Sequence, residues 1–232
     1  MISVIIPTFN EAVHIKATIE KISQCDEGGL IKEIIISDGG SADDTVAITN
    51  SIGVKAVISP KKGRAAQMNY GASFATENIL YFLHADTIPP KNFTADILRA
   101  IEDGYGAGCF MLSFDYNHWL LKANCWFTRF DIDAVRFGDQ SLFVKRKIFK
   151  KAGGFDEKHI VLEDQHIVKQ IKKISRFTVI KKPMLTSARK YLENGIYKTK
   201  GTFYLIYFMY RVGFSQQKLV ATYRKLIKQN KV

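Results

Sequence analysis

Four short apolar runs alternate with longer, mixed segments in the first part of the chain. The runs occupy residues 2–7, 31–37, 54–58 and 79–83, and each is mostly apolar. Continuous apolar runs of this length predict strands that are buried on both faces. Because a helix-length segment separates each run from the next, the pattern predicts a mostly parallel sheet with right-handed crossovers and flanking helices.

The segments between the runs predict helices. In the first segment, apolar residues recur at helical spacing at Ile15, Ile19 and Ile22. Asn10 is a residue type that caps such a helix, and Ser41 stands in the same position before a helix expected over residues 43–51. Acidic residues in that second helix's first turn would stabilise it. A run of small residues predicts a third helix over residues 65–75.

Polar clusters follow three of the predicted strands. They are Thr8-Phe9-Asn10-Glu11, Asp38 and His84-Ala85-Asp86. The carboxyl ends of parallel strands share one sheet edge, where ligands bind in open α/β sheets. Asp86 has a second interpretation, a turn residue before Pro89-Pro90, and Asp38 likewise has a turn-capping alternative.

The chemistry at this edge favours a metal-chelated nucleoside diphosphate. Carboxylates bind hard cations, and Arg64, in the loop before the third helix, suits a phosphate. A GxGxxG sequence does not follow the first run, and a Walker lysine motif is absent, so a dinucleotide site is not expected.

The second half predicts a helix over residues 93–101, a loop and strand over 104–114, and a strand over 141–144. Residues 115–135 are rich in aromatics, for which we favour a helix packed on the sheet over an acceptor-side wall. Glu163-Asp164 opens a further helix, in which the residues of the apolar face are Ile167, Ile171 and Ile174. Acidic residues in a first turn also have a purely capping interpretation.

The composition limits the classes of protein to which this chain can belong. A hydrophobic fraction of 47% in 232 residues supports a packed core, and three separated cysteines favour a reducing, cytoplasmic setting over a disulfide or zinc framework. A signal peptide is not evident at Met1.

The net charge of +12 is concentrated in the last part of the chain. Residues 181–232 carry 12 Lys and Arg against one acidic residue, Glu193, whereas residues 1–180 carry 22 against 21. The apolar stretch at 202–210 is too short to span a bilayer, and an amphipathic basic segment follows it. This tail suits an anionic membrane surface or packs on the main domain, and the two interpretations stay open. Without a recognised nucleic-acid module, we expect no nucleic-acid partner.

Taken together, these motifs resemble family 2 glycosyltransferases. The resemblance rests on six successive motifs in the family's order: residues 7–11, 38–45, 63–69, 84–86, 138–140 and 153–155, followed by Glu163-Asp164. It implies the A-type nucleotide-diphospho-sugar transferase fold and sugar transfer with inversion. The sequence of residues 63–69 particularly resembles a small bacterial subfamily of these enzymes.

The resemblance implies roles for the first half. Pro7, Thr8, Asn10, Glu11 and Asp38 would hold the base and ribose of a nucleoside-diphosphate sugar, for which we expect UDP. Arg64 would contact the base or diphosphate. Asp86 would bind a divalent cation, Mn²⁺ or Mg²⁺, but His84 stands where the family has a first acidic residue, so His84 is either a metal ligand or a ribose or phosphate contact.

In the second half, the resemblance makes Asp164 the general base, with Glu163 orienting it or binding the acceptor. Gly138, Asp139 and Gln140 would line the sugar or the acceptor, with a surface turn as the alternative. Similar enzymes have an Arg six residues after the base, where this chain has Gln170.

We therefore expect a catalytic domain at residues 1–185, with a nucleotide-binding half at 1–90 and an acceptor half at 91–185, and a basic helical tail at 186–232. The acceptor is not identified; a lipid-linked one at the inner membrane face would fit the tail. The competing hypotheses are a sugar nucleotidyltransferase and a non-catalytic protein that binds nucleotide sugars or associates with membranes.

Overall fold

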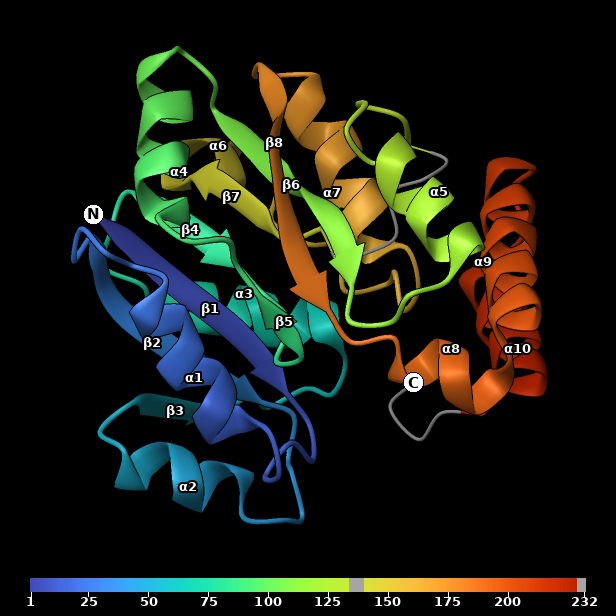
Figure 1. Ribbon diagram of the computed structural model, residues 1–232, viewed down its shortest axis with the longest axis horizontal. Helices are drawn as coiled ribbons and strands as arrows, with labels where there is room; N and C mark the ends of the chain where they lie inside the picture. Colours follow the sequence, from blue (N-terminus) through green and yellow to red (C-terminus); the bar gives the residue numbers. More distant parts are fainter. Residues whose placement is uncertain (134–139, 229–232) are drawn as a thin grey trace.

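The computed structural model describes residues 1–133 and 140–228, and its centre is one curved, eight-stranded sheet (Figure 1). The strand order is β3-β2-β1-β4-β7-β6-β8-β5. The strands are β1 (Ile2–Thr8), β2 (Ile31–Asp38), β3 (Lys55–Ile58), β4 (Ile79–Phe82), β5 (Thr87–Ile88), β6 (Ala107–Phe114), β7 (Leu142–Lys145) and β8 (Phe177–Thr186).

The N-terminal half has the parallel arrangement that the sequence predicts. β1 pairs in parallel with β2 and β4, and β2 pairs in parallel with β3. β1 and β4 are buried along their whole length, as their continuous apolar runs require. The crossovers are α1 (Ile15–Gln24), α2 (Thr45–Ser51) and α3 (Arg64–Phe74).

The predicted caps of α1 and α2 are wrong. α1 begins four residues later than Asn10 would allow, with His14 at its N-cap, and Asn10 instead has a left-handed backbone with φ 54°. Asp44 stands at the N-cap of α2, and the first turn of this helix has no acidic residue. Asn10 and Ser41 form hydrogen bonds between their two loops, so tertiary contacts replace the local caps.

The C-terminal half adds antiparallel strands. β7 lies antiparallel between β4 and β6, whereas β8 runs parallel to β6 and pairs antiparallel with β5. The helices of this half are α4 (Phe93–Glu102), α5 (Trp119–Phe127), α6 (Arg146–Lys151) and α7 (Glu163–Lys172). The predicted helix over 93–101 and the strands near 104–114 and 141–144 correspond to α4, β6 and β7.

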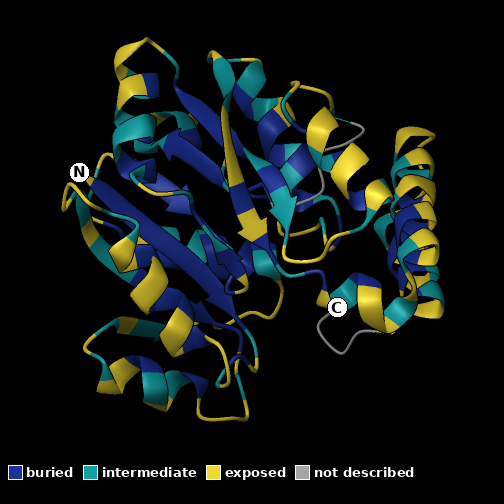
Figure 2. Ribbon diagram, viewed as in Figure 1, coloured by how far each residue is buried: buried dark blue, intermediate teal, exposed yellow. Residues whose placement is uncertain are grey.

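Successive side chains along a strand point to opposite faces of the sheet, so each face has its own hydrophobic core. One core joins Val4 and Ile6 of β1 to α1 and α4, and the other joins Ile5 to α3, α6 and α7. Figure 2 shows the central strands buried between these helical layers.

The helix expected within residues 115–135 is α5, which packs on β6 through Leu121, but its aromatic residues do not face the sheet as predicted. Leu121 and Asn124 form the buried face of α5. Trp119 is 64% exposed, and Trp126 and Phe127 are both 47% exposed. The aromatic residues of α5 therefore form part of the protein surface.

The basic tail folds into three helices that contact the rest of the chain. They are α8 (Arg189–Asn194), α9 (Ile196–Arg211) and α10 (Gln216–Leu226), with α9 and α10 beside each other at one end of the molecule (Figure 1). Ile206, Leu219 and Tyr223 are buried together with Val161, just before α7. Within residues 1–133 and 140–228, helices with the length and apolar composition needed to cross a bilayer are absent. The predicted boundary at residue 185 stays a prediction.

Gly108 in β6 is required by close packing between strands. A Cβ there would clash with the Phe143 ring and would meet the Thr178 carbonyl oxygen at 2.6 Å. We predict that Gly108→Ala lowers the free energy of unfolding by about 1–3 kcal/mol. Gly201→Ala is the matched control, because a Cβ there meets nothing and alanine favours the helix by about 0.5–1 kcal/mol. Equal urea midpoints for wild type and Gly108→Ala would contradict this packing.

Candidate active site

A cavity of about 970 Å³ lies at the carboxyl ends of β1 and β4 and extends to the start of α7. Its walls come from both halves of the sheet and from the C-terminal helices. Asp86 and Asp164, 78 positions apart in the sequence, both line it. The predicted residues that line this cavity are Pro7, Thr8, Asn10, Glu11, Arg64, His84, Asp86, Glu163 and Asp164.

The loop after β1 is fixed by the loop after β2. The Asn10 amide donates to Ser41 Oγ at 2.8 Å, and the Ala42 amide donates to Asn10 Oδ1 at 2.9 Å. The Glu11 amide donates to Thr45 Oγ1 at 2.8 Å. These reciprocal bonds hold one wall of the cavity in a defined shape.

Asp38 organises this wall from inside the protein. Its side chain is fully buried, and its carboxylate accepts four hydrogen bonds, from Thr8 Oγ1, the Gly40 amide, and the amide and hydroxyl of Ser41. Asp38 is not among the residues that line the cavity. Its hydrogen bonds to Gly40 and Ser41 have the geometry of the turn-capping alternative, and its role toward a ligand stays a prediction.

Gln67 joins the ends of two strands and was missed by the sequence interpretation. Its Nε2 donates to the Thr8 carbonyl at 2.7 Å and to the Ser37 carbonyl at 3.0 Å. Gly39 leaves the room for this side chain, since a Cβ there would lie 3.0 Å from Gln67 Nε2. Gln67 belongs to the motif at residues 63–69, so the sequence did mark it, but the resemblance assigned a role only to Arg64 within that motif.

Asp86 and His84 occupy the turn after β4. The Ala85 carbonyl accepts from Thr18 Oγ1 at 2.8 Å, and the Thr87 amide donates to the His84 carbonyl at 3.2 Å. Asp86 is exposed between buried Ala85 and Thr87. The turn thus presents a carboxylate to the cavity on a fixed backbone, so the turn and the site interpretations are compatible.

An ion pair connects the two halves of the cavity wall. Arg64 Nε at the start of α3 lies 2.8 Å from Glu163 Oε1 at the start of α7. The Glu163 side chain is 1% exposed, whereas that of Arg64 is 38% exposed. Leu162, before the helix, has a left-handed φ of 62°, which is strained for a leucine. Glu163 therefore serves as an internal anchor, and Asp164, the next residue, faces the cavity.

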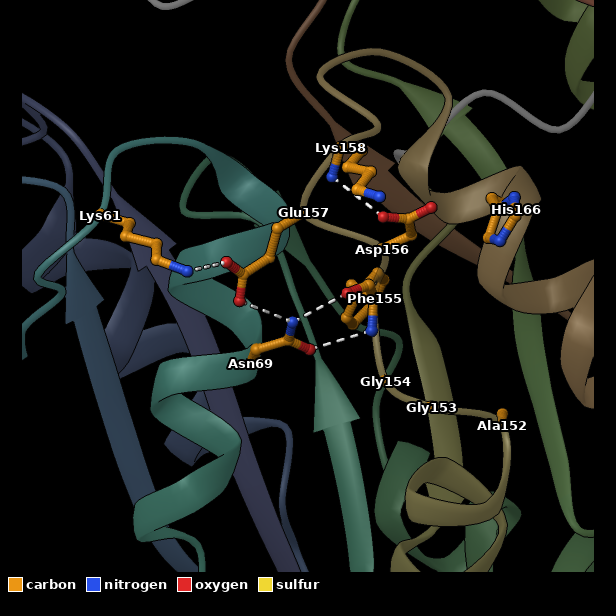
Figure 3. Close-up of a pocket in the computed structure, with 10 residues that line it drawn as sticks. All are labelled: Lys61, Asn69, Ala152, Gly153, Gly154, Phe155, Asp156, Glu157, Lys158 and His166. Atoms are coloured by element: carbon orange, nitrogen blue, oxygen red, sulfur yellow. Dashed lines mark hydrogen bonds and ion pairs between the residues drawn. The ribbon is translucent and has the colours of Figure 1, made fainter.

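A second connection ties α3 to the loop before α7 (Figure 3). Asn69 Nδ2 donates to the Phe155 carbonyl at 2.8 Å, and its Oδ1 accepts from the Phe155 amide at 2.9 Å. Glu157 accepts from Lys61 at 2.8 Å and from Asn69 at 3.3 Å, and these two donors hold the pKa of Glu157 below its ordinary value. Asn69 therefore fixes a loop 86 positions away.

The tail contributes residues to the cavity that the sequence did not reveal. Its basic residues at the cavity are Arg189, Lys190, Arg224 and Lys228, against one acidic residue, Glu193. Tyr191, Phe203, Ile206 and Tyr223 add apolar surface there. One wall of the cavity is thus cationic and partly apolar.

Gln140, assigned from the sequence to the sugar or acceptor, lies inside the protein and does not line the cavity. Gln140 is 2% exposed, and its Nε2 donates to the carbonyls of Phe110 at 3.0 Å and Thr128 at 3.2 Å. It therefore links β6 to the end of α5 inside the protein. Gly138 and Asp139 lie outside the described residues.

The model of glycosyl transferase family 2 matches residues 3–149. This chain belongs to that family. It is therefore a glycosyltransferase, and the cavity at its strand ends is the candidate active site.

A curated relative is a glycosyltransferase as well, and solved structures share the fold. A PGL/p-HBAD biosynthesis glycosyltransferase of Mycobacterium tuberculosis is 29% identical over 176 residues, which are 71% of this chain and 66% of that protein, so the chain spans about two thirds of its length. The Pyrobaculum calidifontis mannosyltransferase PcManGT, in complex with GDP-Man and Mn²⁺, has a TM-score of 0.70 at 18% identity, covering 96% of this chain and 69% of its own.

A second similar structure is the M. tuberculosis glucosyl-3-phosphoglycerate synthase, in complex with Mn²⁺, UDP and phosphoglyceric acid. It has a TM-score of 0.64 at 16% identity, covering 92% of this chain and 79% of its own. These likenesses confirm the mixed α/β fold with flanking helices.

The Arg64–Glu163 pair gives a testable stability effect. We predict that Arg64→Leu lowers the free energy of unfolding by about 1–3 kcal/mol, because it leaves the Glu163 carboxylate buried without its cation. Adding Glu163→Gln should recover part of the loss.

The matched control is Lys61→Leu, which breaks a pair of the same length, 2.8 Å, whose side chains are 71% and 37% exposed. An exposed pair contributes less than about 1 kcal/mol. Additive losses for Arg64→Leu and Glu163→Gln in a double-mutant cycle would show that the two side chains are not coupled.

Proposed function

We propose that this glycosyltransferase moves a sugar from a nucleoside diphosphate, most simply UDP, to an acceptor hydroxyl with inversion of the anomeric centre. The observation that supports this is the shared cavity: a carboxylate on the turn after β4 and a second one at the start of α7 line the same space. With two carboxylates, one can hold the leaving group while the other removes the proton of the acceptor.

The donor's diphosphate belongs at the β4 turn. Asp86 offers an exposed carboxylate, and His84 lies two positions before it and also lines the cavity. Carboxylate, imidazole and phosphate oxygens together form a donor set that suits Mn²⁺ better than Mg²⁺. A bound divalent ion would neutralise charge on the departing nucleoside diphosphate. PcManGT, with the same fold, was solved with GDP-Man and Mn²⁺, which supports the assignment by analogy.

The base and ribose belong against the loop after β1. Thr8, Asn10 and Glu11 line the cavity there, and the bonds from the loop after β2 keep them in place. Arg64 opens α3 at the same cavity, where its guanidinium would meet the diphosphate. In this proposal Asp38 acts indirectly, through the turn that it holds.

Asp164 is the proposed general base. As the acceptor oxygen forms its bond to the anomeric carbon, the bond from that carbon to the diphosphate oxygen breaks, and the hydroxyl proton passes to the Asp164 carboxylate. Inversion requires this carboxylate on the face opposite the diphosphate. Glu163, fixed by Arg64, positions the helix start that carries Asp164.

The cationic wall indicates an acceptor with a negatively charged group. Arg189, Arg224 and Lys228 reach the cavity from α8 and the end of the tail, alongside aromatic residues. A lipid-linked phosphate combines both features. The similar glucosyl-3-phosphoglycerate synthase was solved with phosphoglyceric acid, an anionic molecule.

An exposed aromatic surface next to this wall supports a membrane-proximal acceptor. Tyr197, Tyr204 and Phe208 follow helical spacing on α9 and are 62%, 42% and 62% exposed. α5 lies beside this face, since Trp119 Nε1 donates to the Tyr197 hydroxyl at 3.2 Å. Exposed aromatics next to excess Lys and Arg suit the interface of an anionic bilayer, at the inner face of the plasma membrane in this proposal.

Substitution of the two carboxylates tests the catalytic proposal. We predict that Asp164→Asn lowers kcat about 100-fold or more, with donor affinity retained, because a general base contributes about 10²–10⁴. Asp86→Asn should abolish the Mn²⁺-dependent part of UDP-sugar binding. The measurements are UDP release with a panel of acceptors and calorimetric titration of the donor.

The control is Glu20→Gln, an exposed carboxylate on α1 outside the cavity. Wild-type turnover by Asp164→Asn would contradict the proposed base. Release of pyrophosphate in place of UDP would indicate a nucleotidyltransferase. Donor binding by wild type without turnover on any acceptor would support a non-catalytic binder.

The membrane surface is tested with point variants, because the tail lines the cavity and its deletion would damage the site. We predict that Trp119→Gln with Phe208→Gln weakens binding to phosphatidylglycerol vesicles by about tenfold, from the loss of interfacial aromatic burial. Ile58→Gln, at an exposed side chain (61%) on β3 outside the cavity, is the control. Equal sedimentation of wild type and the double variant would contradict the membrane surface.

A further inference from the structure

A cluster of two histidines and one aspartate lies beside the candidate active site, and the proposed transfer reaction does not use it. Among residues 1–133 and 140–228, Asp156, His159 and His166 form the one group of this kind, with one potential ligand atom from each within 4.8 Å of the others. Asp156 and His166 line a second cavity of about 660 Å³, whereas His159 lines the active-site cavity. The cluster therefore lies between the two spaces.

The three side chains come from two elements. Asp156 and His159 belong to the loop after Phe155, and His166 lies on the first turns of α7. His159 Nδ1 is 3.0 Å from Asp156 Oδ2, and the rings of His159 and His166 have centroids 4.1 Å apart at 35°. Figure 3 shows Asp156 on the loop and His166 on the neighbouring helix, on the same side of the cavity.

The type and geometry of the donors indicate a transition metal. Two imidazoles and a carboxylate suit Zn²⁺ and neighbouring first-row ions, whereas Mg²⁺ and Ca²⁺ take oxygen ligands. Bonds of about 2.0–2.1 Å in a tetrahedral site place neighbouring ligand atoms roughly 3.3 Å apart. The ligand atoms of this cluster, which lie within 4.8 Å of one another, have to move closer to bind one ion, and the partial exposure of His159 (16%) and Asp156 (37%) leaves room for their side chains to rotate.

We propose that Asp156, His159 and His166 form a binding site for one Zn²⁺-type ion, separate from the divalent ion expected with the donor diphosphate. Water completes the coordination from the solvent side. The ion joins the loop to α7 across the segment 160–165, which contains Glu163 and Asp164. It thereby restrains the segment in which Leu162 adopts its strained left-handed conformation. The site itself does not depend on the proposed donor, acceptor or base.

Metal binding is measured on the untagged full chain, stripped with a chelator and without nucleotide. By equilibrium dialysis we expect wild type to bind one equivalent of Zn²⁺, and Co²⁺ to give visible d–d absorption from imidazole ligation. His166→Gln and His159→Gln should each weaken binding by about 100-fold. Asp86→Asn should bind as wild type does, which separates this ion from the one expected with the donor.

Controls distinguish ligation from folding and from other histidines. His14→Gln removes an exposed histidine outside the cluster and should leave Zn²⁺ affinity unchanged. In chelator, His166→Gln should unfold at the wild-type temperature, whereas Zn²⁺ should raise the unfolding temperature of wild type alone. Undiminished Zn²⁺ binding by His166→Gln, or its loss in Asp86→Asn, would overturn the site.

The restraint on α7 is tested by hydrogen exchange. Zn²⁺ should slow amide exchange over residues 160–166 in wild type and not in His166→Gln. Unchanged exchange in zinc-loaded wild type would overturn the restraint. If the cluster is only a hydrogen-bonded Asp–His pair with a second imidazole packed against it, added Zn²⁺ changes neither the absorption nor the exchange.

Discussion

The ion pair between Arg64 and Glu163 is the contact on which the arrangement of the active site depends. Arg64 opens α3 in the N-terminal half of the chain, and Glu163 opens α7 in the C-terminal half. The pair spans 2.8 Å, with the carboxylate 1% exposed. Because a buried carboxylate is costly without a cation, the start of α7 is held against the start of α3. The next residue, Asp164, is thereby presented to the cavity formed by the ends of β1 and β4.

Around this pair, polar side chains act mostly on the backbone. Asp38, Gln67 and Asn69 each form two or more hydrogen bonds that join loops distant in sequence. Asp86 and Asp164 line the cavity, and hydrogen bonds and ion pairs of other residues hold the backbone that carries them. This division explains how a cavity built from loops keeps a defined shape, as the family's transfer chemistry requires.

Local patterns predicted the sheet and the strand-end site, because buried parallel strands carry a continuous apolar signal. They did not predict the caps of α1 and α2, since Asn10 bonds to a loop 32 positions away. The motif around Gln140 likewise did not reveal that this side chain is buried and bonds to the backbone, because burial depends on contacts distant in the sequence. The part of the tail at the cavity depends on packing of Ile206 and Tyr223 near α7, a long-range contact without a local signature.

The most direct test of this account is a structure of the chain with Mn²⁺ and a non-transferable UDP-sugar. The account predicts the ion on Asp86 and the diphosphate, the base against the loop after β1, and the Asp164 carboxylate across the anomeric carbon from the diphosphate. A nucleotide bound outside the cavity, or Asp164 on the same side of the sugar as the diphosphate, would contradict it.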